Sequence, residues 1–168
     1  KCLRKATFQQ IPLQSFPRES AKSALIRVLF VELKQVVAPR TQYSIQQLAS
    51  SMHLYIIRHA WAYEHGDPRW PDDSQRPLEQ EGAERFARVV ELLTQRGFAP
   101  DAIATSPFVR CRQTAEIVAA HSTQSPQLVE LDGLKPGSDF AELIEWTKQQ
   151  RVESVAWVAE RKDLIYSL

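Results

Sequence analysis

An arginine and a histidine stand directly behind a short apolar run in the middle third of the chain. Residues 54–57 are rich in aromatic and β-branched side chains, which is typical of a strand buried on both faces. A parallel strand would deliver Arg58 and His59 to the carboxyl edge of its sheet, where open α/β sheets bind ligands. The plain alternative is that Arg58 snorkels at a strand end and His59 is an ordinary satisfied polar residue.

A second strand end of this kind follows further along the chain, and we call the two strand ends corners. Residues 100–106 form a strand candidate that runs straight into a helix candidate, in which Ser106 suits the N-cap and the next residue is a proline. Arg110 then lies one turn inside the helix, near an N-terminus whose free N–H groups attract anions. The alternative is that Arg110 is a solvated helix residue, since Arg112 and Glu116 beside it form an ordinary i, i+4 pair.

Together the two corners indicate a phosphate site. Two arginines that converge there would hold a phosphate dianion through bidentate, charge-assisted hydrogen bonds. A neutral His59 beside them could attack phosphorus and carry the phosphoryl group until water removes it. We therefore predict His59, Arg58 and Arg110 as catalytic residues, and Arg58, Arg110 and Ser106 as substrate-binding residues.

Strands and helices alternate along the sequence that positions these residues. A loop dense in Pro, Asp and Gly follows the first strand over residues 62–82. We predict helices over residues 79–97, 106–121 and 139–150, and further strands over residues 126–131 and 152–158. This alternation predicts an α/β fold, a three-layer sandwich whose central, mainly parallel sheet is flanked by helices.

The composition excludes several classes of protein. The chain has 168 residues, of which 43% are hydrophobic and 24% charged, as in one ordinary globular domain. Its net charge of +1 gives no reason to expect nucleic acid or a membrane as a partner. Two cysteines, Cys2 and Cys111, make no disulfide framework, and no cluster has metal-ligand spacing. We therefore expect no metal, no cofactor and a cytoplasmic protein, which we take to be a monomer.

Charge divides the chain into two parts. Residues 1–51 carry eight Lys/Arg against two Asp/Glu, a net +6, whereas residues 52–168 carry thirteen against eighteen, a net −5. Met52 is also the only methionine, and the first strand candidate starts right behind it. We therefore predict a folded domain over residues 52–168 and a basic, weakly ordered N-terminal extension over residues 1–51. Within this extension, residues 23–37 could form an amphipathic helix.

Four segments, "LYIIRHAWA", "RPLEQEG", "DAIATSPFVRCRQTAEI" and "LKPGSD", follow one another in the order seen in a known family. Through them, residues 52–158 resemble the histidine phosphatase superfamily, and more closely the SixA-like phosphohistidine phosphatases. The resemblance implies a phosphoglycerate mutase-like sandwich and no metal requirement. It also implies that His59 is the phosphorylated nucleophile and that Arg58 and Arg110 clamp the phosphate.

The first motif favours one branch of that family. The mutase and sugar-bisphosphatase branches usually continue it as RHGxTxxN and carry an acidic proton donor on an inserted segment. This chain has "RHAWAYEH" followed by a compact loop. An imidazole leaves phosphorus readily, so a dedicated acid matters less than it does for an alcohol. The resemblance therefore implies a signal-transduction enzyme that dephosphorylates the phosphohistidine of a histidine-containing phosphorelay protein.

The resemblance fails behind the last strand candidate. Where the family continues as "VAWVGHxPD", this chain has Ala159 and Glu160 after "VAWV", so Glu160 stands at the position of the second phosphate-binding histidine. A carboxylate there would repel a phosphate dianion, and the domain is expected to be truncated or altered beyond Val158. The alternative to the enzyme is a catalytically impaired remnant, or a non-catalytic module that binds phosphoproteins.

Overall fold

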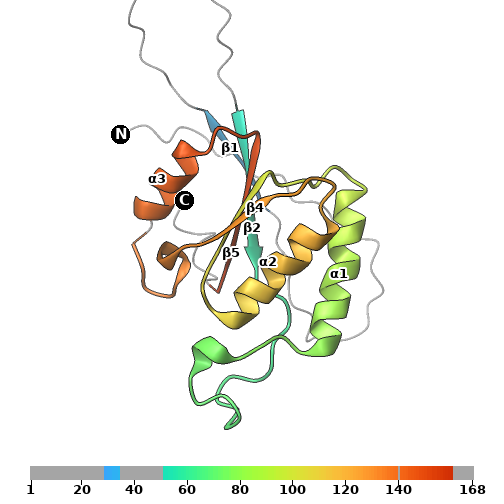
Figure 1. Cartoon of the computed structure of the whole chain (residues 1–168), viewed down its shortest axis with the longest axis vertical. Helices are drawn as coiled ribbons and strands as arrows, with labels where there is room; N and C mark the ends of the chain where they lie inside the picture. The colour runs from blue at the N-terminus through green and yellow to red at the C-terminus, as the bar shows by residue number, and fades with distance from the viewer. Residues whose placement is uncertain (1–28, 35–50, 140, 161–168) are drawn as a thin grey trace, which may run out of the picture.

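The computed structural model describes residues 29–34, 51–139 and 141–160. One five-stranded sheet runs through the molecule in the order β1-β2-β5-β3-β4 (Figure 1). Its strands are β1 (Leu29–Lys34), β2 (Ser51–Arg58), β3 (Ala102–Thr105), β4 (Gln127–Glu130) and β5 (Ser154–Ala159). The helices are α1 (Gln80–Thr94), α2 (Val109–His121) and α3 (Ala141–Gln149), with short 3₁₀ turns η1 (Asp73–Gln75) and η2 (Asp132–Leu134).

Four strands of the sheet are parallel, as the alternating pattern predicted. β5 lies between β2 and β3, and β4 pairs with the other edge of β3. The register places Arg58 opposite Ala159, and Thr105 opposite Val158. Because the strands run in the same direction, the ends of β2, β3 and β5 meet at one edge of the sheet, where the candidate site lies.

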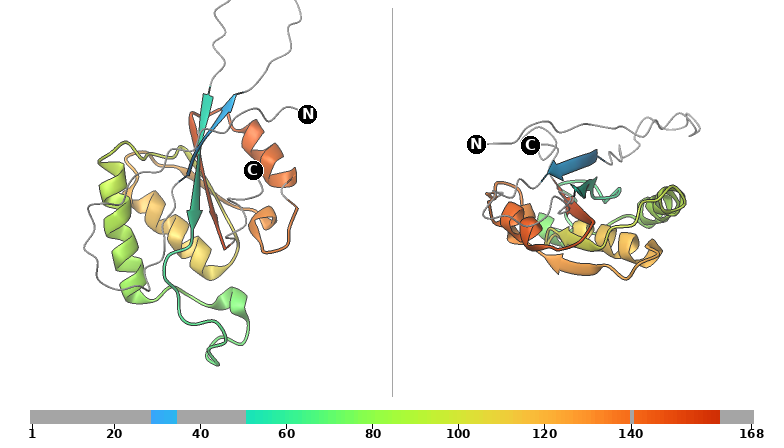
Figure 2. Two further views of the ribbon diagram at one scale, coloured as in Figure 1. Left: turned by 180° about the vertical axis from the view of Figure 1, so that it is seen from behind. Right: turned by 90° about the horizontal axis from the view of Figure 1, so that it is seen from above.

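Helices cover both faces of the sheet (Figure 2). On one face, α1 and α2 pack their buried side chains, Phe86 and Val118 among them, against Tyr55 and Ile57 of β2. On the other face, α3 and η2 pack against side chains that include Trp157. Alternate residues of β2 and β5 therefore enter opposite cores. The predicted three-layer α/β sandwich is confirmed.

The first strand corrects one expectation. We expected an amphipathic helix over residues 23–37, but the described part of that stretch, Leu29–Lys34, is a strand that pairs antiparallel with β2. The pairing runs from Leu29 opposite Ile56 to Lys34 opposite Ser51, so it covers the edge of β2 that β5 leaves open. A sheet edge offers a row of backbone partners, and these outweigh a helical pattern in a short segment. The domain boundary at Met52 stays a prediction.

The predicted helix end at Gly97 shows how local signals set the remaining elements. Gly97 has a φ of 93°, and its N–H donates to the Thr94 carbonyl, which closes α1.

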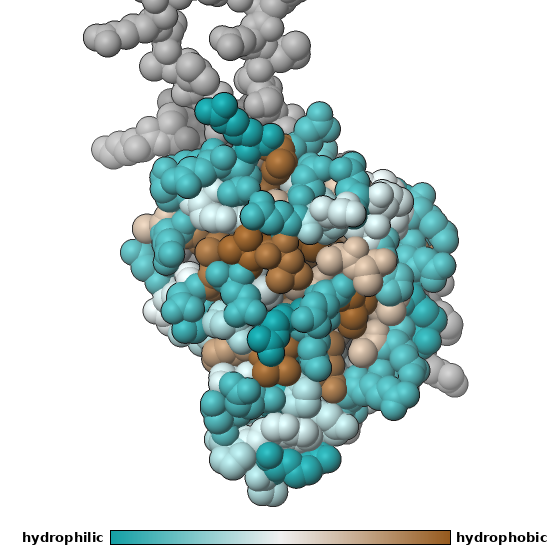
Figure 3. All heavy atoms as spheres, in the orientation of Figure 1, coloured by the Kyte–Doolittle hydropathy of each residue, from teal (hydrophilic) through white to brown (hydrophobic). Residues whose placement is uncertain are grey.

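The space-filling view of Figure 3 shows the same side of the molecule as Figure 1. Apolar side chains reach the surface in the middle of this side, between α3 and α2, and hydrophilic side chains surround them. In the ranges that the structure describes, no helix has the length and apolar character needed to cross a membrane.

Candidate active site

Arg58 and His59 lie at the carboxyl edge of the sheet, as the first motif predicted. Arg58 is the last residue of β2, and the His59 N–H donates to the Ala159 carbonyl of β5 at 3.1 Å. This bond carries the β2–β5 pairing one residue past the strand, so the position of the histidine backbone is set by the sheet. The His59 side chain leaves the sheet at its rim and is largely buried.

The ring of His59 is oriented by its own chain. Nδ1 lies 2.6 Å from the Ala60 carbonyl oxygen, which can only accept, so Nδ1 carries a proton and, in the neutral ring, Nε2 holds the lone pair. Burial lowers the pKa of His59 below its ordinary value, and the charges of Arg110 and Arg58 act in the same direction, while Glu160 and the Ala60 carbonyl oppose the shift. A neutral imidazole with a free Nε2 is the form that a nucleophile needs.

Arg110 is completely buried in the first turn of α2. The alternative of a solvated Arg110 is therefore wrong. That description fits Arg112, which is well exposed and pairs with Glu130 of β4 at 3.5 Å, not with Glu116 as its spacing suggested. Two neighbouring arginines of one helix thus have different roles, and only Arg110 reaches the site.

Ser106 is also buried, but it does not cap the helix. α2 begins at Val109 with Phe108 as its N-cap, because the Ser106 N–H donates to the Val158 carbonyl at 2.9 Å and so continues the sheet past β3. The Ser106 hydroxyl accepts from the Phe108 N–H at 3.4 Å and stabilises the turn between strand and helix. The N-cap expectation is wrong for this reason, and the assignment of Ser106 to substrate binding stays a prediction.

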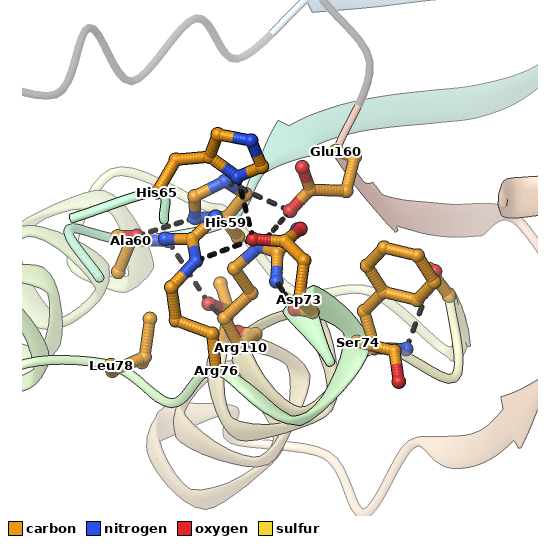
Figure 4. A network of polar contacts seen from close by, with 12 residues as sticks. His59, Ala60, His65, Asp73, Ser74, Arg76, Leu78, Arg110 and Glu160 are labelled. Atoms are coloured by element: carbon orange, nitrogen blue, oxygen red, sulfur yellow. Dashed lines mark hydrogen bonds and ion pairs between the residues drawn. The ribbon is translucent and has the colours of Figure 1, made fainter. Parts of the chain in front are cut away.

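Glu160 joins His59 to the buried Arg110 (Figure 4). Its Oε1 lies 3.1 Å from His59 Nε2, and Arg110 donates from Nε to the same oxygen. We expected this carboxylate to act as a repulsive charge in an anion site. Within the folded chain it is instead paired with the arginine that was expected to hold phosphate, because β5 ends between β2, which leads to His59, and β3, which leads into α2.

Asp73 is a site residue that the sequence did not reveal. From η1, its backbone carbonyl and its Oδ2 accept from Nη1 and Nη2 of Arg110, the latter at 2.7 Å. Its Oδ1 accepts from Arg76 Nε at 2.8 Å and lies 2.9 Å from His65 Nδ1. Although burial opposes it, these contacts hold the pKa of Asp73 well below its usual range, so the group is an anion at neutral pH. The i, i+3 spacing to Arg76 was the only local signal.

Two side chains of α2 hold the loops around the site. Gln113 Oε1 accepts from the Leu78 N–H at 2.8 Å, and Thr114 Oγ1 accepts from the Ala60 N–H at 3.0 Å. Both bonds join α2 to the segment that follows β2. The residues of the "RCRQTA" stretch therefore supply the buried Arg110 and, one turn later, the groups that hold the loop after His59 in place.

Arg58 offers a further donor. Within the described residues, its Nε is the buried side-chain nitrogen or oxygen that has no hydrogen-bond partner. Buried donors are almost always paired in folded proteins, so an unpaired guanidinium N–H at the sheet edge is an unusual feature. Together with its effect on the pKa of His59, this places a second positive charge near His59.

Comparison with known proteins agrees with this geometry. Residues 54–163, more than half of the chain, match the family model of the histidine phosphatase superfamily (branch 1). An uncharacterized protein of Picosynechococcus sp. (strain ATCC 27264 / PCC 7002 / PR-6) is 36% identical over 98 residues, and this chain spans 58% of the length of that curated relative. The match likewise covers 58% of this chain.

Solved structures have the same fold. A protein assigned as the phosphohistidine phosphatase SixA of Agrobacterium tumefaciens is 26% identical, with a TM-score of 0.55 over 65% of this chain and 69% of that chain. The protein histidine phosphatase SixA, solved in complex with tungstate, is 23% identical, with a TM-score of 0.58 over 67% and 72%. The family model and the shared fold show that this chain belongs to the histidine phosphatase superfamily.

Proposed function

We propose that the chain is a phosphohistidine phosphatase with His59 as its nucleophile. The observation that carries this proposal is that His59 Nε2 and Arg110 Nε both contact one oxygen of one carboxylate, Glu160 Oε1. A phosphoryl oxygen has the same charge and hydrogen-bonding character as that carboxylate oxygen. The nucleophile and a buried guanidinium are therefore close enough to act on the same anionic group.

The first step transfers the phosphoryl group to the enzyme. The Nε2 lone pair of His59 forms a bond to phosphorus while the P–N bond of the substrate phosphohistidine breaks, and the electron pair of that bond, with a proton from solvent, goes to the substrate imidazole. Arg110 and Arg58 would neutralise charge on the phosphoryl oxygens. The Ala60 carbonyl keeps the proton on Nδ1, so the ring becomes a phosphorylated imidazolium.

Water completes the reaction. It attacks phosphorus on the side opposite to His59, the bond to Nε2 breaks, and its electron pair restores the neutral ring. Both protons of the water leave with inorganic phosphate. The two steps regenerate the enzyme without any redox change.

The state of Asp73 favours phosphohistidine over a phosphate ester as the substrate. An alcohol leaving group needs a proton donor, and Asp73, whose carboxylate is bound to Arg110, is held in the anionic form by its three basic neighbours. Imidazole needs less assistance as a leaving group. This supports a phosphoprotein partner, and we propose a histidine-containing phosphorelay domain, with the enzyme acting as a cytoplasmic monomer in signal transduction.

A phosphate-release assay tests the proposal. The full chain is mixed with a phosphohistidine-carrying phosphorelay domain, and inorganic phosphate is measured for this chain, for His59→Ala and for the control variant His121→Ala on the surface of α2. We expect release that His59→Ala abolishes and His121→Ala leaves unchanged, with acid-labile phosphate trapped on His59. Binding of the phosphorylated domain without release would identify a non-catalytic binding module, and equal release by His59→Ala would overturn the proposal.

A further inference from the structure

Glu160 holds a fixed place beside the nucleophile. It follows the last residue of β5, and Ala159 is opposite Arg58 in the parallel pairing of β5 with β2. The Ala159 carbonyl also accepts from the His59 N–H at 3.1 Å. The backbone of His59 and of Ala159 is therefore held by the sheet, and a rotation of the Glu160 side chain would open the site without breaking this pairing.

The carboxylate occupies the space that an attacked phosphoryl group needs. Reacting atoms in a productive complex lie about 3–3.5 Å apart. Glu160 Oε1 lies 3.1 Å from His59 Nε2, which is the atom that would attack. If a proton lies between the two atoms, it engages the lone pair of Nε2. If no proton lies there, the carboxylate oxygen stands between Nε2 and an approaching phosphorus atom. The nucleophile is obstructed in either case.

The same carboxylate uses the donor that a phosphate would use. Arg110 directs Nη1 and Nη2 to Asp73, so Nε is the N–H that it turns toward His59, and Glu160 accepts this bond. Glu160 is mostly buried, with 18% of its side chain exposed. Its charged or titratable neighbours include His59 from the end of β2, Arg110 and the buried Cys111 from α2, and Asp73 of η1 on the far side of the guanidinium.

We infer that Glu160 is an internal anion seated in the phosphate position, which a phosphorylated substrate must displace. This inference rests on the proposed function and adds a regulatory element to the same site. A binding site that is open for only a fraction of the time has its apparent dissociation constant raised by the inverse of that fraction. If Glu160 fills the position about 90% of the time, phosphate binds about tenfold more weakly than to the open site.

Phosphate binding to the full chain tests the inference. Inorganic phosphate is titrated by calorimetry into the unaltered chain, Glu160→Ala, Glu160→Gln and the matched control Glu130→Gln, whose carboxylate pairs with Arg112 on the other side of α2. We expect Glu160→Ala to bind phosphate about tenfold more tightly or better, Glu160→Gln to lie between, and Glu130→Gln to match the unaltered chain. Equal or weaker binding by both Glu160 variants would overturn the inference.

A measurement on the unaltered chain covers the case in which removing Glu160 impairs folding. The side-chain carboxyl carbon of Glu160 is followed by NMR while phosphate is added, together with the ring of His59. If phosphate displaces Glu160, both signals should shift over the same range of phosphate concentration and stop shifting at the same concentration. A shift of His59 without any shift of Glu160 would show that phosphate binds beside the carboxylate, and the inference would be wrong.

The proposed function and the inference fail in different ways. If Arg110→Ala abolishes phosphate binding and Glu160→Ala does not change it, the phosphate site is supported and the role of Glu160 is wrong. Binding that neither Arg110→Ala nor His59→Ala weakens shows that phosphate binds elsewhere. In that case the proposed function fails, and the inference fails with it.

Discussion

The Ala60 N–H donates to Thr114 Oγ1 at 3.0 Å, and the same hydroxyl donates to the Arg110 carbonyl at 2.6 Å. One buried hydroxyl thus connects Ala60, the residue after His59, with the turn of α2 that carries Arg110. Ala60 and Thr114 are 54 positions apart in the chain. The contact therefore joins the loop after β2 to the start of α2.

Thr114→Val should destabilise the protein by about 1–3 kcal/mol, because valine has the shape of threonine but leaves the buried Ala60 N–H without an acceptor. The loss of the contact should also weaken phosphate binding, since the loop after β2 is no longer held against α2. Urea denaturation measures the free energy of unfolding. As a control, Thr94→Val removes an exposed bond of 3.3 Å to the His121 carbonyl and should change stability by less than about 0.5 kcal/mol. Equal effects of both variants would mean that the Thr114 contact has no special role.

Arg110→Ala should weaken binding of vanadate or phosphate far more than Arg112→Ala does. Arg110 is buried and faces His59 through the Glu160 carboxylate, whereas Arg112 is exposed and pairs with Glu130. A charged hydrogen bond of this kind contributes about 1.5–3 kcal/mol, so we expect a loss of roughly 10- to 150-fold for Arg110→Ala. Arg112→Ala should lose less than about threefold. Similar losses would indicate a diffuse positive surface in place of a clamp.

The sequence predicted the two corners of the site because strand ends and helix starts have local signals. The apolar residues 54–57 and the buried residues of β3 set the strands, and a parallel sheet brings their ends together. The positions of Arg58, His59 and Arg110 could therefore be predicted from the sequence alone. The position of each residue follows from its own strand or helix and from the rule that parallel strands end at the same edge of the sheet.

What the sequence did not predict depends on contacts between distant segments. Asp73 reaches Arg110 across 37 positions, and nothing in the loop before α1 indicates how the chain turns back. Glu160 was identified as a departure from the family pattern, but its pairing with Arg110 follows from the side-chain geometry at the end of β5. The strand β1 was missed because the partner that selects a strand over a helix there is β2.

Gly82→Ala should destabilise the protein, although alanine normally stabilises a helix relative to glycine by about 1 kcal/mol. A Cβ on Gly82 would lie 2.8 Å from the Trp61 Cβ and would also overlap the Trp61 carbonyl oxygen. The same carbonyl accepts from the Glu79 N–H at 3.1 Å, so the start of α1 cannot move away freely. We expect a loss of about 1–3 kcal/mol in thermal or urea unfolding. Glu81→Ala in the same turn is the control, and an increase in stability for Gly82→Ala would contradict this packing.

A fragment of residues 52–168 should fold by itself, as the proposed domain boundary at Met52 requires. The core side chains that the structure describes, from Met52 to Ala159, all lie within this fragment. Losing β1 opens the edge of β2, so we expect lower stability but still one cooperative urea transition. A fragment of residues 29–168, which keeps β1, is the matched comparison. If the shorter fragment showed no cooperative transition while the longer one did, β1 would belong to the folded unit and the boundary would be wrong.

The pH dependence of His59 should follow from its surroundings. Burial lowers the pKa of its ring, helped by the charges of Arg110 and Arg58. Only the neutral ring has a lone pair on Nε2, so transfer of phosphate to His59 should be constant at and above neutral pH. It should fall only below pH 6.5, the ordinary value for histidine. The unfolded chain takes up its proton near that value and the folded chain at a lower pH, so this group also makes unfolding easier as the pH falls below 6.5.

An NMR titration of the His59 ring checks both the direction and the cause of this shift, with His59→Ala identifying the signal. Glu160 raises the pKa of His59 against the larger effect of burial, so Glu160→Gln should move the midpoint still lower. Glu130→Gln, which changes a carboxylate paired with Arg112, should leave the midpoint in place. An upward movement in Glu160→Gln would show that Glu160 does not raise the pKa of His59. A midpoint above 6.5 in the unaltered chain would show that an ion pair with Glu160 dominates over burial. His59 would then be a protonated partner of that carboxylate at neutral pH, without a lone pair to attack phosphorus.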